Sequence, residues 1–259
     1  MSDSRHSTLR PFWRYFGAKW RHARRYPNPT HGIIVEPFAG AAGYSLFWSG
    51  IFYRRSVVLV EKNPAICEVW RYLISTQAAE IAALPAVDHV DDLPSATPEA
   101  ARLFIGMCFG AGDTRPRVAV SSMVRRDGGW VKLRDRAAKQ VARIRHWRII
   151  EGDYMLAPDV EATWFIDPPY HVAGARAPRS ERGRVRYPFG ADDIDFTALA
   201  EWCRARRGQT IVCEQPGATW LPFRQLGETQ SVGDRWSGEA VWINDSATPT
   251  SNLISSDRL

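Results

Sequence analysis

The sequence predicts an α/β fold built on a doubly wound, mostly parallel sheet, and three observations lead to this prediction. Short apolar runs typical of buried strands alternate with stretches in which apolar residues recur every three or four positions, as on one face of a helix. A glycine-rich turn follows the first apolar run, at 38–43, and acidic residues close several of the others. Strand, glycine turn, helix and second strand in this order form a βαβ unit, which implies parallel strands.

The first βαβ unit lies near the start of the chain. Strands are expected at 33–35, a short and fully apolar run, and at 56–60, where four apolar residues follow Ser56, and each run is followed by a glutamate. A helix-like run begins at Tyr44, after the glycine turn. A second helix is expected directly after Pro64, and its apolar residues keep helical spacing as far as Leu84. This unit would place the glycine turn at the carboxyl end of the first strand.

The second half of the chain resumes the same alternation. Its expected elements are strands at 148–150, 163–166 and 210–213 and a helix at about 194–206. Two further apolar stretches, at 231–232 and 240–243, are separated by polar and glycine residues. That pattern predicts an antiparallel hairpin at the carboxyl-terminal end of the sheet.

Residues 85–148 interrupt the alternation and are interpreted as a small inserted basic domain. Residues 85–101 are rich in proline, aspartate and alanine and predict a loop. Two β-prone arms surround Asp127-Gly128-Gly129, which indicates a β-hairpin, and a basic helix is expected from Arg134 to about His146. The α/β domain would then comprise residues 1–84 and 149–259.

Composition excludes several classes of protein. No apolar run approaches the roughly 20 residues of a membrane span. The first ten residues are polar and lack the apolar stretch of a secretion signal. The four cysteines form no CxxC pair and no zinc-binding spacing. We therefore expect a cytoplasmic protein with reduced cysteines, no membrane segment and no metal.

The positive charge is concentrated in three segments. The net charge is +6, yet residues 1–31 carry seven Arg or Lys against one acid, residues 102–150 twelve against three, and residues 171–190 five against one. The rest of the chain is therefore acidic, so the basic segments would form a directed positive face. Aromatic residues lie among the arginines of the first two segments, and both side-chain types stack on nucleobases. Nucleic acid is the favoured polyanion.

Asp167-Pro168-Pro169-Tyr170 is the most specific motif in the sequence. It follows the buried strand expected at 163–166, so it lies at a carboxyl strand end, where α/β sheets bind ligands. The prolines stiffen the turn, and because proline has no N–H it leaves nearby carbonyl oxygens available. A carboxylate, a carbonyl and an aromatic face together suit a flat ring with an exocyclic amine.

Three other strand ends carry candidate ligand groups. Glu36 precedes the glycine turn, whose spacing differs from the dinucleotide-binding fingerprint because Phe38 stands at its first position. Glu61 closes the second strand, where a carboxylate can accept both hydroxyls of a ribose. Asp153 follows the strand expected at 148–150. Each of these residues alone is weak evidence, since strand ends commonly carry exposed acids.

Together these motifs resemble the S-adenosylmethionine-dependent DNA adenine-N6 methyltransferases, in particular the group like DNA adenine methylase. The resemblance covers residues 12–244 in family order, is weakest across 85–150, and looks like the family's alpha group (D12 class). The motifs that carry it are Tyr15-Phe16-Gly17-Ala18-Lys19, Glu36 to Gly43, Glu61-Lys62-Asn63-Pro64, Gly152-Asp153-Tyr154 and Asp167-Pro168-Pro169-Tyr170. Phe16 and Ala18 depart from the family, where many relatives have small residues or glycine.

The resemblance implies a Rossmann-like methyltransferase fold, S-adenosylmethionine as cofactor, and a role for each matched position. Asp167, Pro168 and Tyr170 would be catalytic, with Asp167 binding the target amine and Tyr170 stacking on the flipped base. Glu61 would hold the ribose hydroxyls, and Asp153 the adenine amino group of the cofactor. The remaining residues implied in cofactor binding are Tyr15, Phe16, Lys19, Glu36, Phe38, Ala39, Gly40 and Tyr154, with Tyr15 and Lys19 at its methionine part.

The inserted basic domain is expected to recognise double-stranded DNA. Its candidate DNA-binding residues are Arg117, Arg125, Arg126, Lys132 and Arg134, the last four flanking the predicted hairpin turn. Most protein–DNA hydrogen bonds go to phosphates, so for any one of these residues a phosphate contact is the better expectation. The arginine-rich loop at 171–190 is expected to close over a flipped base. A homodimer on a palindromic site is a weaker expectation.

Other activities stay open on the sequence. The amine-binding argument fits cytosine N4 in DNA and adenine in RNA as well as adenine N6 in DNA, and the resemblance alone favours the last. A non-catalytic DNA-binding relative is a third reading. The intact Asp167 motif and Lys19 argue against it.

Overall fold

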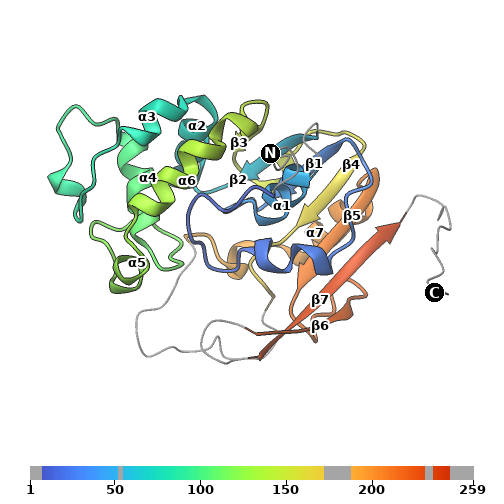
Figure 1. Ribbon diagram of the computed structural model, residues 1–259. Coiled ribbons are helices and arrows are strands. Elements are labelled where there is room, and N and C mark those ends of the chain that lie inside the picture. Colours follow the sequence, from blue (N-terminus) through green and yellow to red (C-terminus); the bar gives the residue numbers. More distant parts are fainter. Residues whose placement is uncertain (1–7, 52–54, 172–187, 231–235, 246–259) are drawn as a thin grey trace, which may run out of the picture.

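The protein contains a seven-stranded sheet with a lobe of helices at one end (Figure 1). The computed structural model describes residues 8–51, 55–171, 188–230 and 236–245. The sheet order is β3-β2-β1-β4-β5-β7-β6. The strands are β1 (Ile33–Pro37), β2 (Ser56–Glu61), β3 (Arg148–Glu151), β4 (Ala162–Ile166), β5 (Gly208–Glu214), β6 (Arg224–Gln230) and β7 (Trp236–Asp245).

Strands β3, β2, β1, β4 and β5 are parallel, and β7 pairs antiparallel with both β5 and β6. This confirms a mostly parallel α/β sheet with an antiparallel end. The chain moves outward from β1 in one direction through β2 and β3, and in the other through β4 and β5. The topological switch point therefore lies between β1 and β4, where doubly wound sheets bind their ligands.

Successive residues of the central strands point to opposite faces, so the sheet has two apolar layers. One face carries Ile34, Leu59 and Phe165 and packs against the amino-terminal segment and the helices that follow β1 and β2. The other carries Val35, Trp164 and Val212 and packs against the helix that precedes β5. Parallel strands buried on both faces are necessarily almost wholly apolar, which is why these runs could be recognised in the sequence.

The helices are α1 (Gly43–Ile51), α2 (Pro64–Ser75), α3 (Ala78–Ala82), α4 (Glu99–Phe109), α5 (Ser122–Arg126), α6 (Val131–Gln140) and α7 (Phe196–Arg204). Short 3-10 helices include η2 (Lys19–Arg25), η4 (Val141–Ile144) and η5 (Tyr154–Leu156). Asn63 caps α2 by accepting a hydrogen bond from the Ala65 amide at 3.1 Å, and Pro64 occupies the first turn, where its missing N–H has no cost. The single helix expected as far as Leu84 is divided into two, because α2 ends at Ser75 and α3 begins at Ala78.

The predicted β-hairpin around Asp127-Gly128-Gly129 is wrong: its arms are the helices α5 and α6. Ser121 caps α5 through a 3.3 Å bond from the Val124 amide. Gly128 and Gly129 then adopt φ values of 93° and 73°, a left-handed conformation that ends a helix as readily as it turns a hairpin. The basic helix expected from Arg134 begins earlier, at Val131, and gives way to η4 after Gln140.

The segment at 85–148 also contains a helix that the sequence did not predict. α4 begins at Glu99, within the expected loop, and buries Phe104, Ile105 and Cys108. It packs against α2, while α6 packs against α3. The apolar core of this helical lobe is continuous with that of α2, so residues 85–148 share one core with the α/β domain rather than forming a separate one.

The carboxyl-terminal hairpin exists and is formed by β6 (Arg224–Gln230) and β7, and residues 231–232, expected as its first strand, are not among the described residues. Residues 231–235, between β6 and β7, lie outside the described residues, as do residues 172–187 of the arginine-rich loop. Among the helices of the described residues, none combines the length and apolar character needed to cross a membrane.

Candidate active site

Two turns meet at the switch point of the sheet. β1 and β4 are neighbours with Val35 opposite Trp164, so the residues that follow each strand emerge at the same edge. The glycine-rich turn follows β1, and Asp167-Pro168-Pro169-Tyr170 follows β4. Two of the sequence-predicted motifs are therefore brought together by strand order, at the place where this type of sheet binds ligands.

The turn after β1 is held in an unusual backbone conformation. Phe38 has φ of 62° and Ala42 has φ of 49°, both in the left-handed region that side chains disfavour. Such residues cost about 1–3 kcal/mol each and persist where the surroundings enforce them, commonly at ligand-binding turns. Gly40 also has positive φ, and a Cβ there would lie 2.8 Å from the ring of Tyr15. The turn therefore needs glycine at this position and is covered by the amino-terminal segment.

Glu61 ties the end of β2 to the same turn. Its Oε2 accepts a hydrogen bond from the Gly40 amide at 2.8 Å, and its Oε1 accepts one from the Asn63 amide at 2.8 Å. A carboxylate has about four acceptor positions, so roughly two remain for a ligand. Burial raises the pKa of Glu61, while the backbone bonds act in the opposite direction. The residue is thus fixed in place with capacity left for a pair of hydroxyls.

An aromatic pair joins the turns that follow β1 and β3. Phe38 and Tyr154 stack with ring centroids 5.5 Å apart and planes at 28°. Asp153 caps η5 by accepting from the Met155 amide and lies 3.5 Å from the ammonium of Lys62. Phe38, Glu61, Asp153 and Tyr154 therefore lie at the carboxyl ends of three neighbouring strands, β1, β2 and β3.

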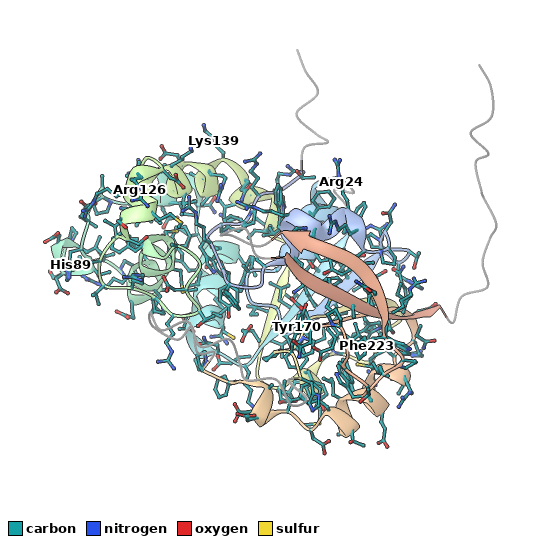
Figure 2. The ribbon with its side chains drawn as sticks, turned by 90° about the horizontal axis from the view of Figure 1, so that it is seen from below. Arg24, His89, Arg126, Lys139, Tyr170 and Phe223 are labelled. Atoms are coloured by element: carbon teal, nitrogen blue, oxygen red, sulfur yellow. The ribbon has the colours of Figure 1, made fainter. Side chains whose placement is uncertain are left out.

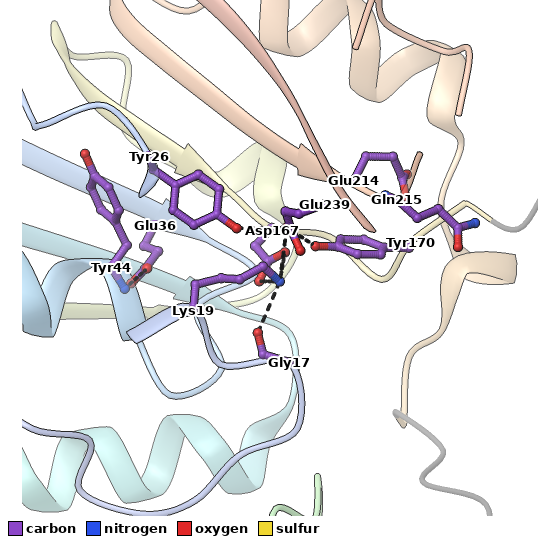
Figure 3. Close-up of polar contacts among 10 residues, drawn as sticks. All are labelled: Gly17, Lys19, Tyr26, Glu36, Tyr44, Asp167, Tyr170, Glu214, Gln215 and Glu239. Carbon is purple, nitrogen blue, oxygen red and sulfur yellow. Dashed lines mark hydrogen bonds and ion pairs between the residues drawn. The ribbon is translucent and has the colours of Figure 1, made fainter. Parts of the chain in front are cut away.

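Lys19 binds directly to Asp167, the first residue of the turn after β4 (Figure 3). Its ammonium lies 2.8 Å from Oδ1 and 2.9 Å from Oδ2 of the carboxylate and donates to the Gly17 carbonyl at 3.1 Å. Lys19 is 8% exposed, and its nitrogen lies 4.9 Å from the centre of the Tyr170 ring. Lys19, which the family resemblance implies at the methionine part of the cofactor, thus forms an ion pair with Asp167, the predicted catalytic aspartate.

Glu239, on β7, is a site residue that sequence reasoning did not find. Its Oε1 accepts hydrogen bonds from the hydroxyl of Tyr170 at 2.5 Å and from that of Tyr26 at 2.8 Å. The same oxygen lies 3.8 Å from the Lys19 ammonium. Glu239 therefore connects the hairpin to the turn after β4 and to the amino-terminal segment. No local pattern could reveal it, because its partners lie 69 and 213 residues away in the sequence.

The charged groups of this cluster are largely removed from water. Burial raises the pKa of Asp167 to about 6, opposed by the nearby Lys19 ammonium. Burial alone would lower the pKa of Lys19, but the adjacent carboxylates reverse this and hold it well above its ordinary value. Burial also raises the pKa of the Tyr170 hydroxyl. At neutral pH the lysine is therefore charged, the aspartate ionised and the tyrosine neutral.

The Asp167, Cys213 and Glu239 side chains place their ligand atoms within 4.8 Å of one another, a spacing that a metal ion could bridge. The Lys19 ammonium already lies among them, in contact with Asp167. Burial raises the pKa of the Cys213 thiol well above its ordinary value, which disfavours the thiolate that binds metals. We therefore infer that the Lys19 ammonium, rather than a metal ion, supplies the positive charge beside these three side chains.

The chain that follows Tyr170 is anchored by Glu214 at the end of β5. The Glu214 carboxylate accepts hydrogen bonds from the His171 amide at 3.0 Å, from the Trp220 indole at 2.9 Å and from the Gln215 amide at 2.8 Å. The Gln215 side chain in turn donates to the His171 carbonyl at 2.8 Å. Both ends of the proline turn are thereby held, which keeps Asp167 and Tyr170 in fixed positions.

Glu36 is buried beneath the glycine turn at 3% exposure. One carboxyl oxygen accepts from the Tyr44 amide at 3.2 Å, and the other has no hydrogen-bond partner. Burial raises its pKa to about 8, opposed by hydrogen bonds from α1. Ala39 is buried in the same turn, whereas Phe16 is 54% exposed on the amino-terminal segment. Cofactor contacts of Glu36, Ala39 and Phe16 stay predictions.

The candidate DNA-binding residues lie on the helical lobe, where Figure 2 labels Arg126. Arg126 and Lys132 are exposed, and Arg125 forms an exposed ion pair with Asp88 at 3.1 Å. Arg117 pairs with Asp113 at 3.3 Å. The Arg134 guanidinium instead donates to the Leu84 carbonyl at 2.6 Å and to Asp135, so it serves the packing of the lobe. DNA contacts by all five stay predictions.

In comparisons with known proteins, no protein-family model matches the chain and no curated protein is significantly similar to it. The functional conclusion therefore depends on the chemistry of the site. That site combines a rigid carboxylate beside an aromatic ring, a strained glycine turn and a second carboxylate with free acceptor positions, all at the switch point of an α/β sheet.

Proposed function

We propose that this protein is a site-specific DNA methyltransferase that transfers a methyl group from S-adenosylmethionine to adenine N6 in double-stranded DNA. The observation that carries the proposal is the turn after β4. There Asp167 and Tyr170 lie together at the β1/β4 switch point, fixed by Lys19, Glu239 and the anchored residue His171. A carboxylate and an aromatic ring held in this way suit a planar ring with an exocyclic amine.

The residues at the adjacent edge fit the cofactor. Glu61 has acceptor positions left after its two backbone bonds, as the hydroxyls of a ribose require. The stacked Phe38 and Tyr154 rings offer an aromatic surface, and Asp153 lies next to them with an acceptor for an amino group. Bound S-adenosylmethionine would supply an electrophilic methyl group carried on a positively charged sulfur.

Asp167 and Pro168 would make the amine of the target base more reactive. The lone pair of an adenine amine is delocalised into the ring, which makes it a poor nucleophile. The Asp167 carboxylate and the Pro168 carbonyl would accept its two N–H bonds and hold the hydrogens so that the lone pair faces the methyl group. Tyr170 would stack on the base. Alignment of this kind supplies a large part of the rate enhancement in many enzymes.

The transfer balances without a base before attack. The bound cofactor would supply the methyl carbon to which the amine nitrogen bonds, and the electron pair of the broken carbon–sulfur bond would leave with the neutral thioether. The nitrogen would then carry one proton too many. The Asp167 carboxylate, whose pKa is about 6, is ionised at neutral pH and can take up this proton and pass it to water. The base must first leave the duplex, which costs a few kcal/mol.

Nucleoside mass spectrometry tests the proposal directly. Purified protein would be incubated with S-adenosylmethionine and either plasmid DNA or RNA, and the nucleic acid then digested to nucleosides. We expect N6-methyladenine in the DNA and no modification of the RNA. A matched reaction with an Asp167→Asn variant is expected to yield none, because the amide replaces one acceptor with a donor.

Three results would contradict the proposal, each in favour of a different reading. N4-methylcytosine would identify a cytosine methyltransferase that uses the same amine pocket. Methylated adenine in RNA alone would change the substrate. Tight binding of DNA and cofactor without any transfer would indicate a non-catalytic relative.

A further inference from the structure

The buried cluster at the active site contains one cation and two anions in direct contact. The Lys19 ammonium is bonded to Asp167 and lies 3.8 Å from Glu239. The side chains of Lys19 and Glu239 are each 10% exposed, and that of Asp167 is 20% exposed. With both carboxylates ionised, the cluster carries one unbalanced negative charge in surroundings that screen it poorly.

Among the residues that the structure describes, the titratable neighbours of the cluster do not compensate this charge. Burial raises the pKa of the Tyr26 and Tyr170 hydroxyls and of the Cys213 thiol, so all three are neutral at pH 7. His22, on η2, is close enough to interact electrostatically with Glu239. Burial lowers the pKa of its imidazole, so His22 is neutral at pH 7 as well. Glu36, on β1, is protonated at pH 7 because its pKa is about 8. None of these groups adds positive charge.

Glu239 is the member of the cluster to which the proposed transfer assigns no role. Asp167 accepts from the target amine and Lys19 neutralises one carboxylate, whereas Glu239 receives bonds from two tyrosines and faces the ammonium from β7. A glutamine at position 239 could accept hydrogen bonds from the same two tyrosine hydroxyls through its amide oxygen. What the carboxylate of Glu239 adds to this arrangement is its negative charge.

We propose that Glu239 makes the active site selective for a cationic ligand, so that the site holds the sulfonium cofactor in preference to the neutral thioether product. This inference rests on the proposed function. The amine bound by Asp167 must lie next to the transferred methyl group, so the sulfonium lies close to the unbalanced charge. Transfer removes the positive charge, and the product loses that attraction. Glu239 thereby favours product release.

Binding without DNA tests the inference. Isothermal titration calorimetry at pH 8 would give the Kd of S-adenosylmethionine and of S-adenosylhomocysteine for wild type, Glu239→Gln and Tyr26→Phe. In wild type we expect the cofactor to bind more tightly than the product. In Glu239→Gln, which keeps the shape and removes the charge, this ratio of Kd values should shrink by about tenfold. Tyr26→Phe removes a hydrogen bond to the same oxygen but no charge, and should leave the ratio unchanged.

A second measurement needs only wild-type protein and applies even if Glu239→Gln fails to fold. Near pH 6 Asp167 is half protonated, and a nearby cation lowers its pKa. Binding of the cofactor should therefore release up to about half a proton, measured by calorimetry in buffers of different ionisation enthalpy, while the thioether product should release none.

An unchanged ratio in folded Glu239→Gln, or equal proton release by both ligands, would overturn the inference and leave the proposed function standing. If neither ligand binds wild type, the proposed function fails and this inference with it.

Discussion

The charged residues at the candidate active-site edge are largely buried and paired, whereas several of those on the helical lobe are exposed to solvent. At the edge, Lys19, Asp167 and Glu239 are largely buried, and the Lys19 ammonium forms ion pairs with both carboxylates. On the lobe, Arg125 and Asp88 form a pair that is 62% and 68% exposed, and Arg126 and Lys132 stand in solvent. The first arrangement is rigid and costly to disturb, and the second is adaptable and weakly stabilising.

This difference separates the two tasks of the proposed enzyme. Alignment for methyl transfer needs groups fixed to a fraction of an ångström, which buried and mutually bonded charges provide. Attraction of a polyanion needs charge that can reach phosphates and that depends on salt, which exposed arginine and lysine provide. Changes at the edge should therefore alter stability and chemistry, whereas changes on the lobe should alter affinity for DNA.

Lys19→Met is expected to have the largest effect on stability. Removing the cation leaves two buried carboxylates facing each other, which typically costs about 3–5 kcal/mol in the free energy of unfolding. Arg125→Met on the lobe is the matched control and should cost less than about 1 kcal/mol, because its partner Asp88 is exposed. Urea unfolding at pH 7.5 measures both. Similar losses in the two variants would erase the proposed distinction between the regions.

Glu36→Gln is expected to stabilise the protein at neutral pH. The folded state raises the pKa of Glu36 from 4.5 to about 8, so it binds a proton that the unfolded chain has released. The contribution of Glu36 to the free energy of unfolding is therefore greatest below pH 4.5 and falls as the pH rises toward 8. At pH 7 the glutamine should add up to about 3 kcal/mol, since it carries no charge to bury.

Urea unfolding of wild type and Glu36→Gln at pH 5 and pH 7.5 checks this expectation. The difference between the two proteins should grow with pH. A constant difference, or a glutamine variant that is less stable at both pH values, would show that Glu36 is ionised in the folded protein.

The double variant Arg126→Ala with Lys132→Ala should have the smallest effect, confined to DNA affinity. If both residues contact phosphates, the slope of log K against log salt should fall by about 2, with unfolding unchanged. Arg134→Ala is the control for stability, because its guanidinium is bonded to the Leu84 carbonyl, so this variant should lower the free energy of unfolding where the double variant does not. The slope is measured by fluorescence anisotropy with a labelled duplex, at salt concentrations from about 50 to about 200 mM. An unchanged slope in the double variant would place the DNA surface elsewhere.

The parallel core could be predicted from the sequence because its strands have no alternative. Residues 33–35 are wholly apolar and residues 163–166 contain one polar side chain, that of Thr163, and a strand buried on both faces accommodates such short runs between glycine and proline turns. The lobe was misread for the opposite reason. Gly128 and Gly129 permit a hairpin turn and a helix end equally, and the choice fell to burial of Leu133 and Ala137 against the rest of the core.

The candidate site was predictable only as far as local motifs extend. Asp167, Glu61 and the glycine turn lie at strand ends and could be read from the sequence, and the structure places them at one edge. The contact of Lys19 with Asp167 spans 148 residues, and Glu239 lies on β7, whose pairing with β5 no local pattern specifies. Those partners depend on tertiary packing, which is why only the structure brings them together.

The most direct test of the central claim is long-read sequencing of plasmid DNA from a methylation-free host that expresses the protein, beside a host that expresses an Asp167→Ala variant. The claim is that the edge around Asp167 carries methyl transfer to adenine. We predict modified adenine within one recurring sequence motif for the wild type, and none for a variant that is present at the same level and folded. Modified adenine at the same motif in the variant would contradict the account.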